Sequence, residues 1–188
     1  MRSLLNRVLM GVLVAVCTGC SRTPMPTGPS QPAPATAEPV TEIPNLAGEY
    51  RITFAAQDCQ SAFPAAARIR TYSSRLAQQD TAIELVLTDL PDIFSTRARP
   101  TLRGTIKPHS LLTLSGYLGN DQWETIHELI TSDNLLSILV DDMKVTPSPQ
   151  GLAGTFSGSF GLYDRGPAGW PTVGSRCTSQ THTVTLAR

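Results

Sequence analysis

The sequence has little of what most catalytic and nucleic-acid-binding chains need. Among 188 residues there are only three histidines and four cysteines, aromatic residues make up 6%, and 15 basic residues balance 15 acidic ones. A nucleic-acid-binding domain carries a basic stripe, which is missing here. Metal sites need clustered His, Cys, Asp or Glu side chains, and His109, His127 and His182 are scattered along the chain. We therefore expect no metal, no other cofactor and no nucleic acid.

Long apolar runs are also missing. The run Val8–Val16 is too short to span a bilayer, which takes roughly 20 apolar residues. It follows the positive charges of Arg2 and Arg7 and precedes small residues. That order of charge, apolar run and small residues is typical of a secretory signal.

The tetrad Cys17-Thr18-Gly19-Cys20 at the end of this leader resembles the lipobox of bacterial lipoproteins, although leucine is usual at the position of Cys17. The resemblance implies a signal peptide over residues 1–19, cleavage before Cys20, and acyl chains such as palmitate on Cys20. An ordinary cleaved secretory signal is the alternative. Because Ser21 rather than aspartate follows, the resemblance also implies the outer membrane, with the domain facing the periplasm or the cell surface.

A proline-rich segment over residues 20–44 separates the leader from the rest of the chain. Its prolines are Pro24, Pro26, Pro29, Pro32, Pro34, Pro39 and Pro44. Such segments favour polyproline II at about 3.1 Å per residue, so this one predicts a spacer of up to ~70 Å between lipid and domain. A ligand for a proline-recognition module is the alternative reading.

Residues 45–188 have the length of a single domain. Without Arg2 and Arg7, the mature chain has 13 basic and 15 acidic residues and a net charge near −2. Alternating apolar and polar residues, as in Tyr50, Ile52 and Phe54, predict half-buried strands. The predicted strands cover residues 48–54, 68–78, 81–88, 101–106, 111–118, 124–130, 135–143, 152–160 and 178–186. A helix competes with a strand over residues 121–132.

Short sequential strands predict an all-β fold, an up-and-down antiparallel meander of eight or nine strands that closes into a small barrel. A two-sheet sandwich is the alternative. The glycines Gly104, Gly116, Gly154 and Gly158 lie inside strand patterns, where they allow bends or bulges. Because strict alternation makes the first and last strands antiparallel only for an even count, nine strands require an exception. Either the 124–130 segment lies outside the barrel or the loop over residues 162–176 crosses an end.

If Cys20 carries lipid, Cys59 and Cys177 are the thiols that remain in the mature chain, and an oxidising compartment predicts a disulfide between them. Cys59 follows the first predicted strand and Cys177 precedes the last, so antiparallel pairing of those strands brings the two together. The segments 59–64, 68–72 and 181–188 resemble a pattern in bacterial exported β-domains of lipocalin-like outline. That resemblance implies no chemistry.

Candidate functional residues are few. The run Gly154–Ser159 lacks the Gly-x-Ser-x-Gly turn of hydrolases, and we find no catalytic motif. Asp141 and Asp142 are predicted to point to opposite faces at a strand end. Arg68, Arg70 and Tyr72 share one strand face, which favours a charged outer surface over a site for an anionic ligand.

His182 and Trp170 are the remaining candidates for a ligand site. His182 shares its face with Val184 and Leu186, which favours a hydrogen-bonded core histidine over a ligand contact. Trp170, in a turn-rich loop, either lines a binding lip or plugs the barrel end.

Two functions fit these observations. One is a non-catalytic module whose barrel binds a small apolar ligand. The other is a structural or protein-interaction lipoprotein of an envelope assembly, with a filled barrel. Interior volume separates them, because a ligand needs a cavity of several hundred Å³.

Overall fold

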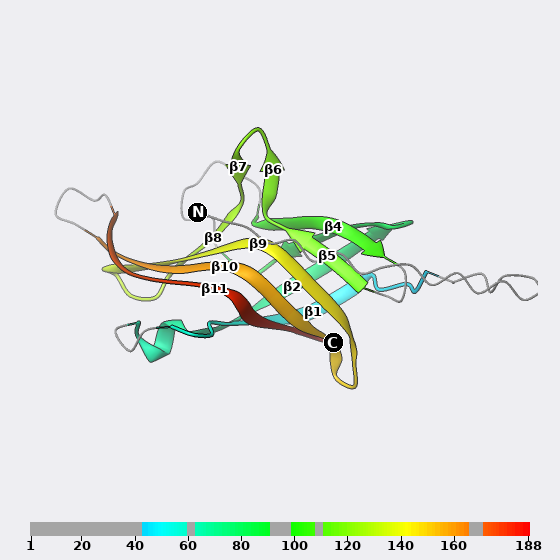
Figure 1. Ribbon diagram of the computed structural model, residues 1–188, viewed down its shortest axis with the longest axis horizontal. Helices are drawn as coiled ribbons and strands as arrows, with labels where there is room; N and C mark the ends of the chain where they lie inside the picture. Colours follow the sequence, from blue (N-terminus) through cyan, green and yellow to red (C-terminus); the bar gives the residue numbers. More distant parts are fainter. Residues whose placement is uncertain (1–42, 60–62, 91–98, 108–110, 166–170) are drawn as a thin grey trace, which may run out of the picture. The chain divides into compact units, whose positions relative to one another are not determined.

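Strands account for most of the described backbone (Figure 1). The computed structural model describes residues 43–59, 63–90, 99–107, 111–165 and 171–188, which belong to a compact unit spanning Val40–Arg188. The strands are β1 (Gly48–Ala55), β2 (Ile69–Gln79), β3 (Ala82–Leu87), β4 (Thr101–Lys107), β5 (Leu111–Ser115), β6 (Tyr117–Gly119), β7 (Gln122–Trp123), β8 (Thr125–Leu129), β9 (Asn134–Ser148), β10 (Gly151–Arg165) and β11 (Pro171–Ala187). The described residues contain one short helical element, the 3-10 turn η1 (Ala65–Ala67).

Eight of the strands close into a barrel. β1, β2, β3, β4, β5, β9, β10 and β11 are hydrogen-bonded in that order, and β11 pairs back onto β1. Every pairing is antiparallel, as an even number of up-and-down strands requires. The predicted small antiparallel barrel is therefore confirmed, and the two-sheet sandwich is not the fold that forms.

β8 is the additional strand, and it lies outside the closed ring, which is one of the two exceptions that the sequence left open. The long strand β9 explains its position. Residues Met143 to Val145 of β9 pair with β5, whereas Leu135 to Leu139 pair with β8. β8 thus lies in line with β5 along the same edge of β9, and the β6–β7 hairpin is inserted between them.

Gly116 marks the point where the chain leaves β5 for this hairpin. Its amide donates to the Val140 carbonyl at 2.9 Å, and its carbonyl accepts from the Glu124 amide at 2.7 Å. A Cβ atom here would lie 2.7 Å from the Glu124 carbonyl oxygen. Only glycine fits this close approach. The predicted single strand over 111–118 is wrong, because β5 ends at Ser115 and β6 begins at Tyr117.

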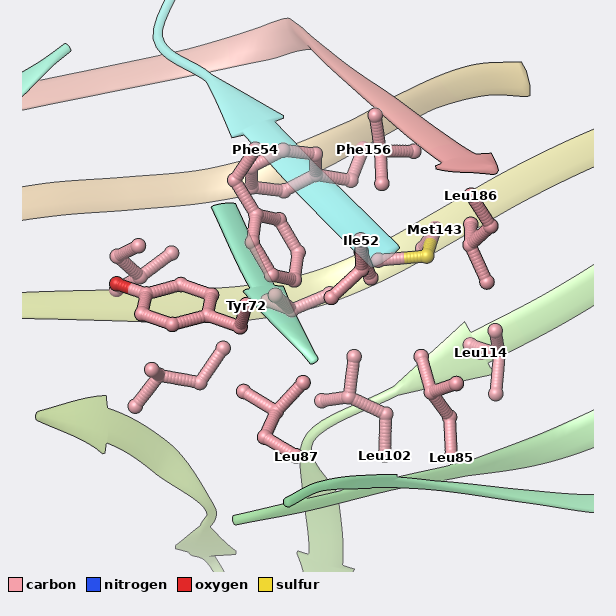
Figure 2. Close-up of a cluster of buried hydrophobic side chains, with 14 of the residues drawn as sticks. Ile52, Phe54, Tyr72, Leu85, Leu87, Leu102, Leu114, Met143, Phe156 and Leu186 are labelled. Atoms are coloured by element: carbon pink, nitrogen blue, oxygen red, sulfur yellow. The ribbon is translucent and has the colours of Figure 1, made fainter. Parts of the chain in front are cut away.

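The interior of the barrel is filled by the inward half of each alternating pattern. In β1, Tyr50, Ile52 and Phe54 are buried, while Glu49 and Arg51 are not. Figure 2 shows part of this cluster, in which the Phe54 and Phe156 rings meet edge to face at 5.5 Å. Burying a side chain of this size contributes roughly 1.5–3 kcal/mol, so the cluster is the main source of the barrel's stability.

Twelve of the buried apolar side chains have no surface open to water. They are Ile52, Phe54, Leu85, Leu87, Leu112, Leu136, Ile138, Val140, Met143, Val145, Phe156 and Phe160, each 0% exposed. A side chain with no such surface borders no void that could hold even one water molecule. These twelve side chains form the closely packed part of the barrel interior.

The last three strands are longer than their sequence patterns predict. β10 continues to Arg165 and β11 begins at Pro171, so most of the predicted long loop over 162–176 belongs to these two strands. β9 likewise continues to Ser148, beyond the predicted end of this strand at residue 143. Pairing along β10 extends both neighbours, because each added residue gains backbone hydrogen bonds that an isolated pattern does not reveal.

Asp141 and Asp142 lie within β9, where a β-bulge changes their orientation. Ser157 pairs with Asp142 and Gly158 pairs with Val140, so Asp141 is an extra residue on the bulged strand. As a result both aspartates are exposed, between the buried Val140 and Met143. The prediction that these carboxylates face opposite sides at a strand end is wrong, because strict alternation fails at a bulge.

Candidate functional site

The barrel wall is incomplete at one end, which we call the disulfide end. β3 pairs with β2 only from Ser74 to Gln79, and β4 pairs with β5 only as far as Ser115. Beyond these points, within the described ranges, no strand lies between the start of β2 and β8. Side chains close this gap.

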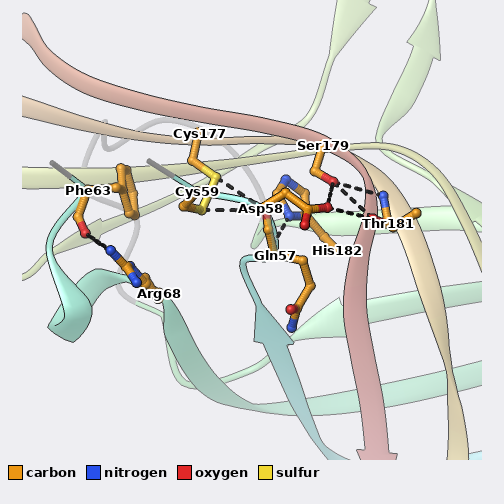
Figure 3. Close-up of a disulfide and its surroundings, with 9 residues drawn as sticks. All are labelled: Gln57, Asp58, Cys59, Phe63, Arg68, Cys177, Ser179, Thr181 and His182. Atoms are coloured by element: carbon orange, nitrogen blue, oxygen red, sulfur yellow. Dashed lines mark hydrogen bonds between the residues drawn. A yellow bond between two sulfur atoms is a disulfide. The ribbon is translucent and has the colours of Figure 1, made fainter. Parts of the chain in front are cut away.

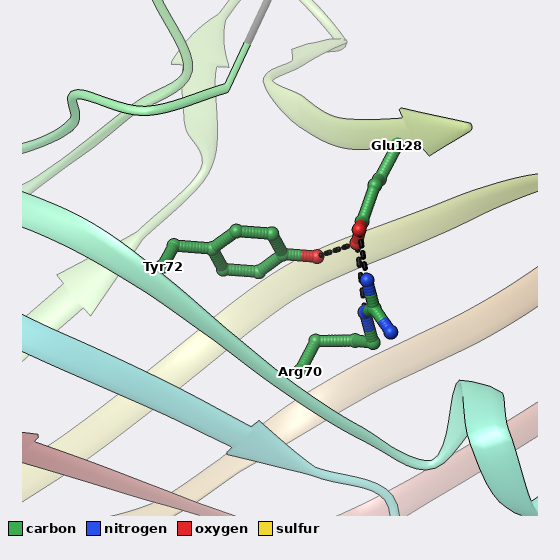
Figure 4. A network of polar contacts seen from close by, with 3 residues as sticks. All are labelled: Arg70, Tyr72 and Glu128. Carbon is green, nitrogen blue, oxygen red and sulfur yellow. Dashed lines mark hydrogen bonds and ion pairs between the residues drawn. The ribbon is translucent and has the colours of Figure 1, made fainter. Parts of the chain in front are cut away.

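Arg70 and Tyr72 of β2 meet Glu128 of β8 in this gap (Figure 4). The Arg70 guanidinium donates to both carboxylate oxygens of Glu128, through Nε at 2.8 Å and through Nη2. The Tyr72 hydroxyl donates to Glu128 Oε2 at 2.7 Å. The carboxylate therefore receives three hydrogen bonds, two of them in the forked arrangement that is strongest for arginine.

The pKa values of Arg70 and Tyr72 are both raised in this cluster. Tyr72 is 3% exposed, and burial, followed by its hydrogen bond to Glu128, raises the pKa of its hydroxyl. The hydrogen bond to Glu128 also raises the pKa of Arg70. Arg70 and Tyr72 of β2 both donate to the one carboxylate of Glu128, so the cluster fastens β8 to β2.

The sequence reading of Arg70 needs correction. Arg70 and Tyr72 do share a face with each other, but it is the inner face that continues into the buried Ser74 and Leu76. A charged outer surface at this position is therefore wrong. Arg68 also has a structural contact, because its guanidinium donates to the Phe63 carbonyl at 2.8 and 3.0 Å.

The predicted disulfide between Cys59 and Cys177 is present at the same end (Figure 3). The two Cα atoms are 5.1 Å apart and 118 residues apart in sequence. Asp58, next to Cys59, has a left-handed φ of 58°, which aspartate tolerates better than most residues. In this conformation its carboxylate accepts from the hydroxyls of Ser179 at 3.2 Å and Thr181 at 3.0 Å.

His182 is a core residue. It is 0% exposed, and its ring lies 5.1 Å from Phe156 and 5.0 Å from Phe160, measured between ring centres. Its Nδ1 atom accepts from the Gln57 backbone amide at 3.0 Å. Burial lowers the pKa of the ring, and the Gly158 carbonyl and the Asp58 charge offset part of that effect. The ring of His182 therefore packs and hydrogen-bonds within the core.

The β6–β7 hairpin stands away from the barrel wall (Figure 1). Asn120 and Asp121 form its tip with left-handed φ values of 51° and 57°, which is the conformation of a two-residue type I′ turn. Tyr117 and Trp123 pair across the hairpin with ring centres 4.9 Å apart. They remain 46% and 40% exposed, and Leu118 is 37% exposed.

Sequence reasoning missed this hairpin. The Asn-Asp pair between Gly119 and Gln122 was a usable turn signal, but the short strands on either side have no alternation to support it. Trp123 was instead considered as part of a competing helix. The structure places it on a strand, with its ring open to solvent.

Other residues singled out from the sequence lie outside the described residues, namely Cys20, His109 and Trp170. Among the residues that are described, no three His, Cys, Asp or Glu side chains gather as metal ligands. The same described ranges contain no helix that is both long and apolar enough to cross a membrane.

Comparison with known proteins adds no identification. No protein family, curated protein or solved structure matches the chain.

Proposed function

We propose that this chain is a lipid-anchored interaction module of the bacterial envelope, which binds a partner protein through its β6–β7 hairpin and takes no ligand into its barrel. The packed interior carries the proposal. A drug-sized ligand needs a cavity of about 300–1,000 Å³, whereas the twelve core side chains named above border no void large enough for water. Of the two readings that the sequence left open, the filled barrel has the support.

The hairpin supports the second half of the proposal. Aromatic residues are enriched in protein interfaces, where they contribute large contact areas at low entropic cost. Elsewhere in the described chain most of the large aromatic side chains are buried in the core, as Phe54, Phe156 and Phe160 are. Tyr117 and Trp123 are held on a rigid turn and still face solvent. Their apolar surface is exposed to solvent and is not used in the core, which is typical of a contact surface.

The membrane anchor in this proposal is supported by the leader and the proline-rich segment of the sequence. Replacing Cys20 by Ala removes the acylated residue and leaves the barrel unaltered. In fractionated cells we expect the parent chain in the membrane pellet and the Cys20→Ala chain in the soluble fraction. Retention of the Cys20→Ala chain in membranes would contradict lipid anchoring.

Site-specific photo-crosslinking tests the interaction surface. A photoreactive amino acid replaces Tyr117 in the full chain, and a matched control places it at Thr105, an exposed position on the barrel wall. We expect a discrete protein adduct from position 117 that disappears when Trp123→Ala is added, and none from position 105. Equal adducts from both positions, or an adduct that is indifferent to Trp123→Ala, would rule out the hairpin as the contact.

A further inference from the structure

We propose that His182 makes the disulfide end pH-sensitive, because a proton on its ring breaks the hydrogen bond between the Gln57 amide and His182 of β11. This proposal stands independently of the proposed function. It concerns the segment from Ala56 to Cys59, which follows β1 and lies against β11 (Figure 3).

The hydrogen bond between Gln57 and His182 fixes which ring nitrogen carries the proton. Nδ1 accepts from the Gln57 amide at 3.0 Å, so it has no hydrogen, and in the neutral ring the hydrogen is on Nε2. An imidazolium ion has hydrogens on both nitrogens. If Nδ1 takes a proton from solvent, its N–H faces the N–H of Gln57, and the bond between them cannot exist.

The surroundings of His182 make a charged ring unstable where it is. The His182 ring contacts the Phe156 and Phe160 side chains of β10, which offer no hydrogen-bond acceptor. Its Nε2 atom makes no hydrogen bond in the structure. The Gly158 carbonyl of β10 and the carboxylate of Asp58 are the groups that favour its charged form. Among the described residues packed against the ring, Asp58 is the charged group that acts on it. Burial outweighs both groups, so the pKa of His182 lies below its usual value.

Water can reach Gln57 and Asp58, which lie on one side of the His182 ring. Gln57 and Asp58 are exposed although His182 itself is buried. When the ring takes a proton, the segment moves away from β11, and the imidazolium gains water and the nearby Asp58 carboxylate as partners. The disulfide still ties Cys59 to Cys177, so the movement is local and the barrel does not unfold.

The pH range follows from the direction of the shift. Above about 6.5, the ordinary pKa of histidine, the ring is neutral in the closed and the open state, and pH has no effect. Below that value the open state binds a proton that the closed state does not. The opening equilibrium therefore rises by up to about tenfold per pH unit as pH falls, until the closed state is itself protonated.

Hydrogen exchange at the Gln57 amide measures this opening. We use the mature chain carrying Cys20→Ala and express exchange relative to the unfolded chain at each pH. Protection of the Gln57 amide should stay constant from pH 8 to 7 and then fall by up to about tenfold per unit. Protection of the Ile52 amide, in the middle of β1, should not change. A constant protection of Gln57 down to pH 5 would overturn the proposal.

Two variants separate His182 from other titrating groups. His182→Asn keeps a short side-chain acceptor without a titrating ring, and it should abolish the fall in protection. His127→Gln removes the other histidine whose pKa burial lowers, and it should leave the fall intact. The opposite pattern would contradict the proposal. If His182→Asn does not fold, NMR titration of the parent chain decides, because the His182 ring and the Gln57 amide must titrate with one midpoint.

Discussion

The barrel and the β6–β7 hairpin use the same residue types in opposite ways. In the barrel, Phe54, Phe156 and Phe160 are fully buried and contact one another. In the hairpin, Tyr117 and Trp123 contact each other but leave nearly half of their surface in water. The comparison teaches that the barrel does not need the hairpin for its core, so the hairpin is free to serve another purpose.

A second difference lies within the barrel itself. Over most of its length the wall is closed by backbone hydrogen bonds between neighbouring strands. At the disulfide end it is closed by side chains, namely the Cys59–Cys177 bridge and the Arg70–Tyr72–Glu128 cluster. These side-chain contacts can be removed one at a time without changing the closed ring of strands, so the comparison can be tested.

The largest effect is expected for a core aromatic. Phe156→Ala leaves a cavity between Phe54, Phe160 and His182, and we expect it to lower the free energy of unfolding by about 4 kcal/mol. Urea denaturation of the parent and variant chains measures this difference. A loss below about 1 kcal/mol would mean that the interior is loosely packed, against the filled barrel described above.

Loss of the disulfide comes next. The bridge closes a loop of more than a hundred residues, so the double variant Cys59→Ser with Cys177→Ser should lose about 3 kcal/mol. The same urea titrations report it, and the ring of strands should still form, with an unchanged far-ultraviolet circular dichroism spectrum. A variant that cannot form the barrel would show that the disulfide end is essential to closure.

A smaller effect is expected for the cluster between β2 and β8. Glu128→Gln keeps the shape but removes the charge that accepts from Arg70 and Tyr72, and it should cost about 1–2 kcal/mol, because the pair is partly exposed. Glu84→Gln is the matched control. Its pair with Arg103 is 3.9 Å long and about half exposed, so it should cost less than about 0.5 kcal/mol. Equal losses of unfolding free energy in the two variants would mean that the cluster stabilises the barrel no more than an exposed ion pair does.

The smallest effect on stability is expected for the hairpin. Tyr117→Ala with Trp123→Ala should change the free energy of unfolding by no more than about 0.5 kcal/mol, because neither side chain contributes to the core. Thermal and urea denaturation both check this value. A loss as large as that of Phe156→Ala would place these rings in the fold and remove the contrast with the barrel.

Local patterns in the sequence were enough to predict the barrel, but they did not reveal the long-range contacts between side chains. Tyr50, Ile52 and Phe54 alternate without interruption, so the strand and its inner face are readable. The disulfide was predictable because strand order brings its two ends together. Arg70 and Glu128 are 58 residues apart, and no local pattern connects them. The bulge at Asp141 depends on pairing with β10, which alternation within β9 does not show.

The packed interior is the claim on which the proposed function depends, and native mass spectrometry tests it most directly. The mature chain carrying Cys20→Ala is purified from the soluble fraction without denaturant, and its mass is measured intact. We expect the mass of the mature polypeptide with one disulfide and nothing else. A small apolar molecule retained at one per chain would contradict the filled barrel and restore the ligand-binding reading.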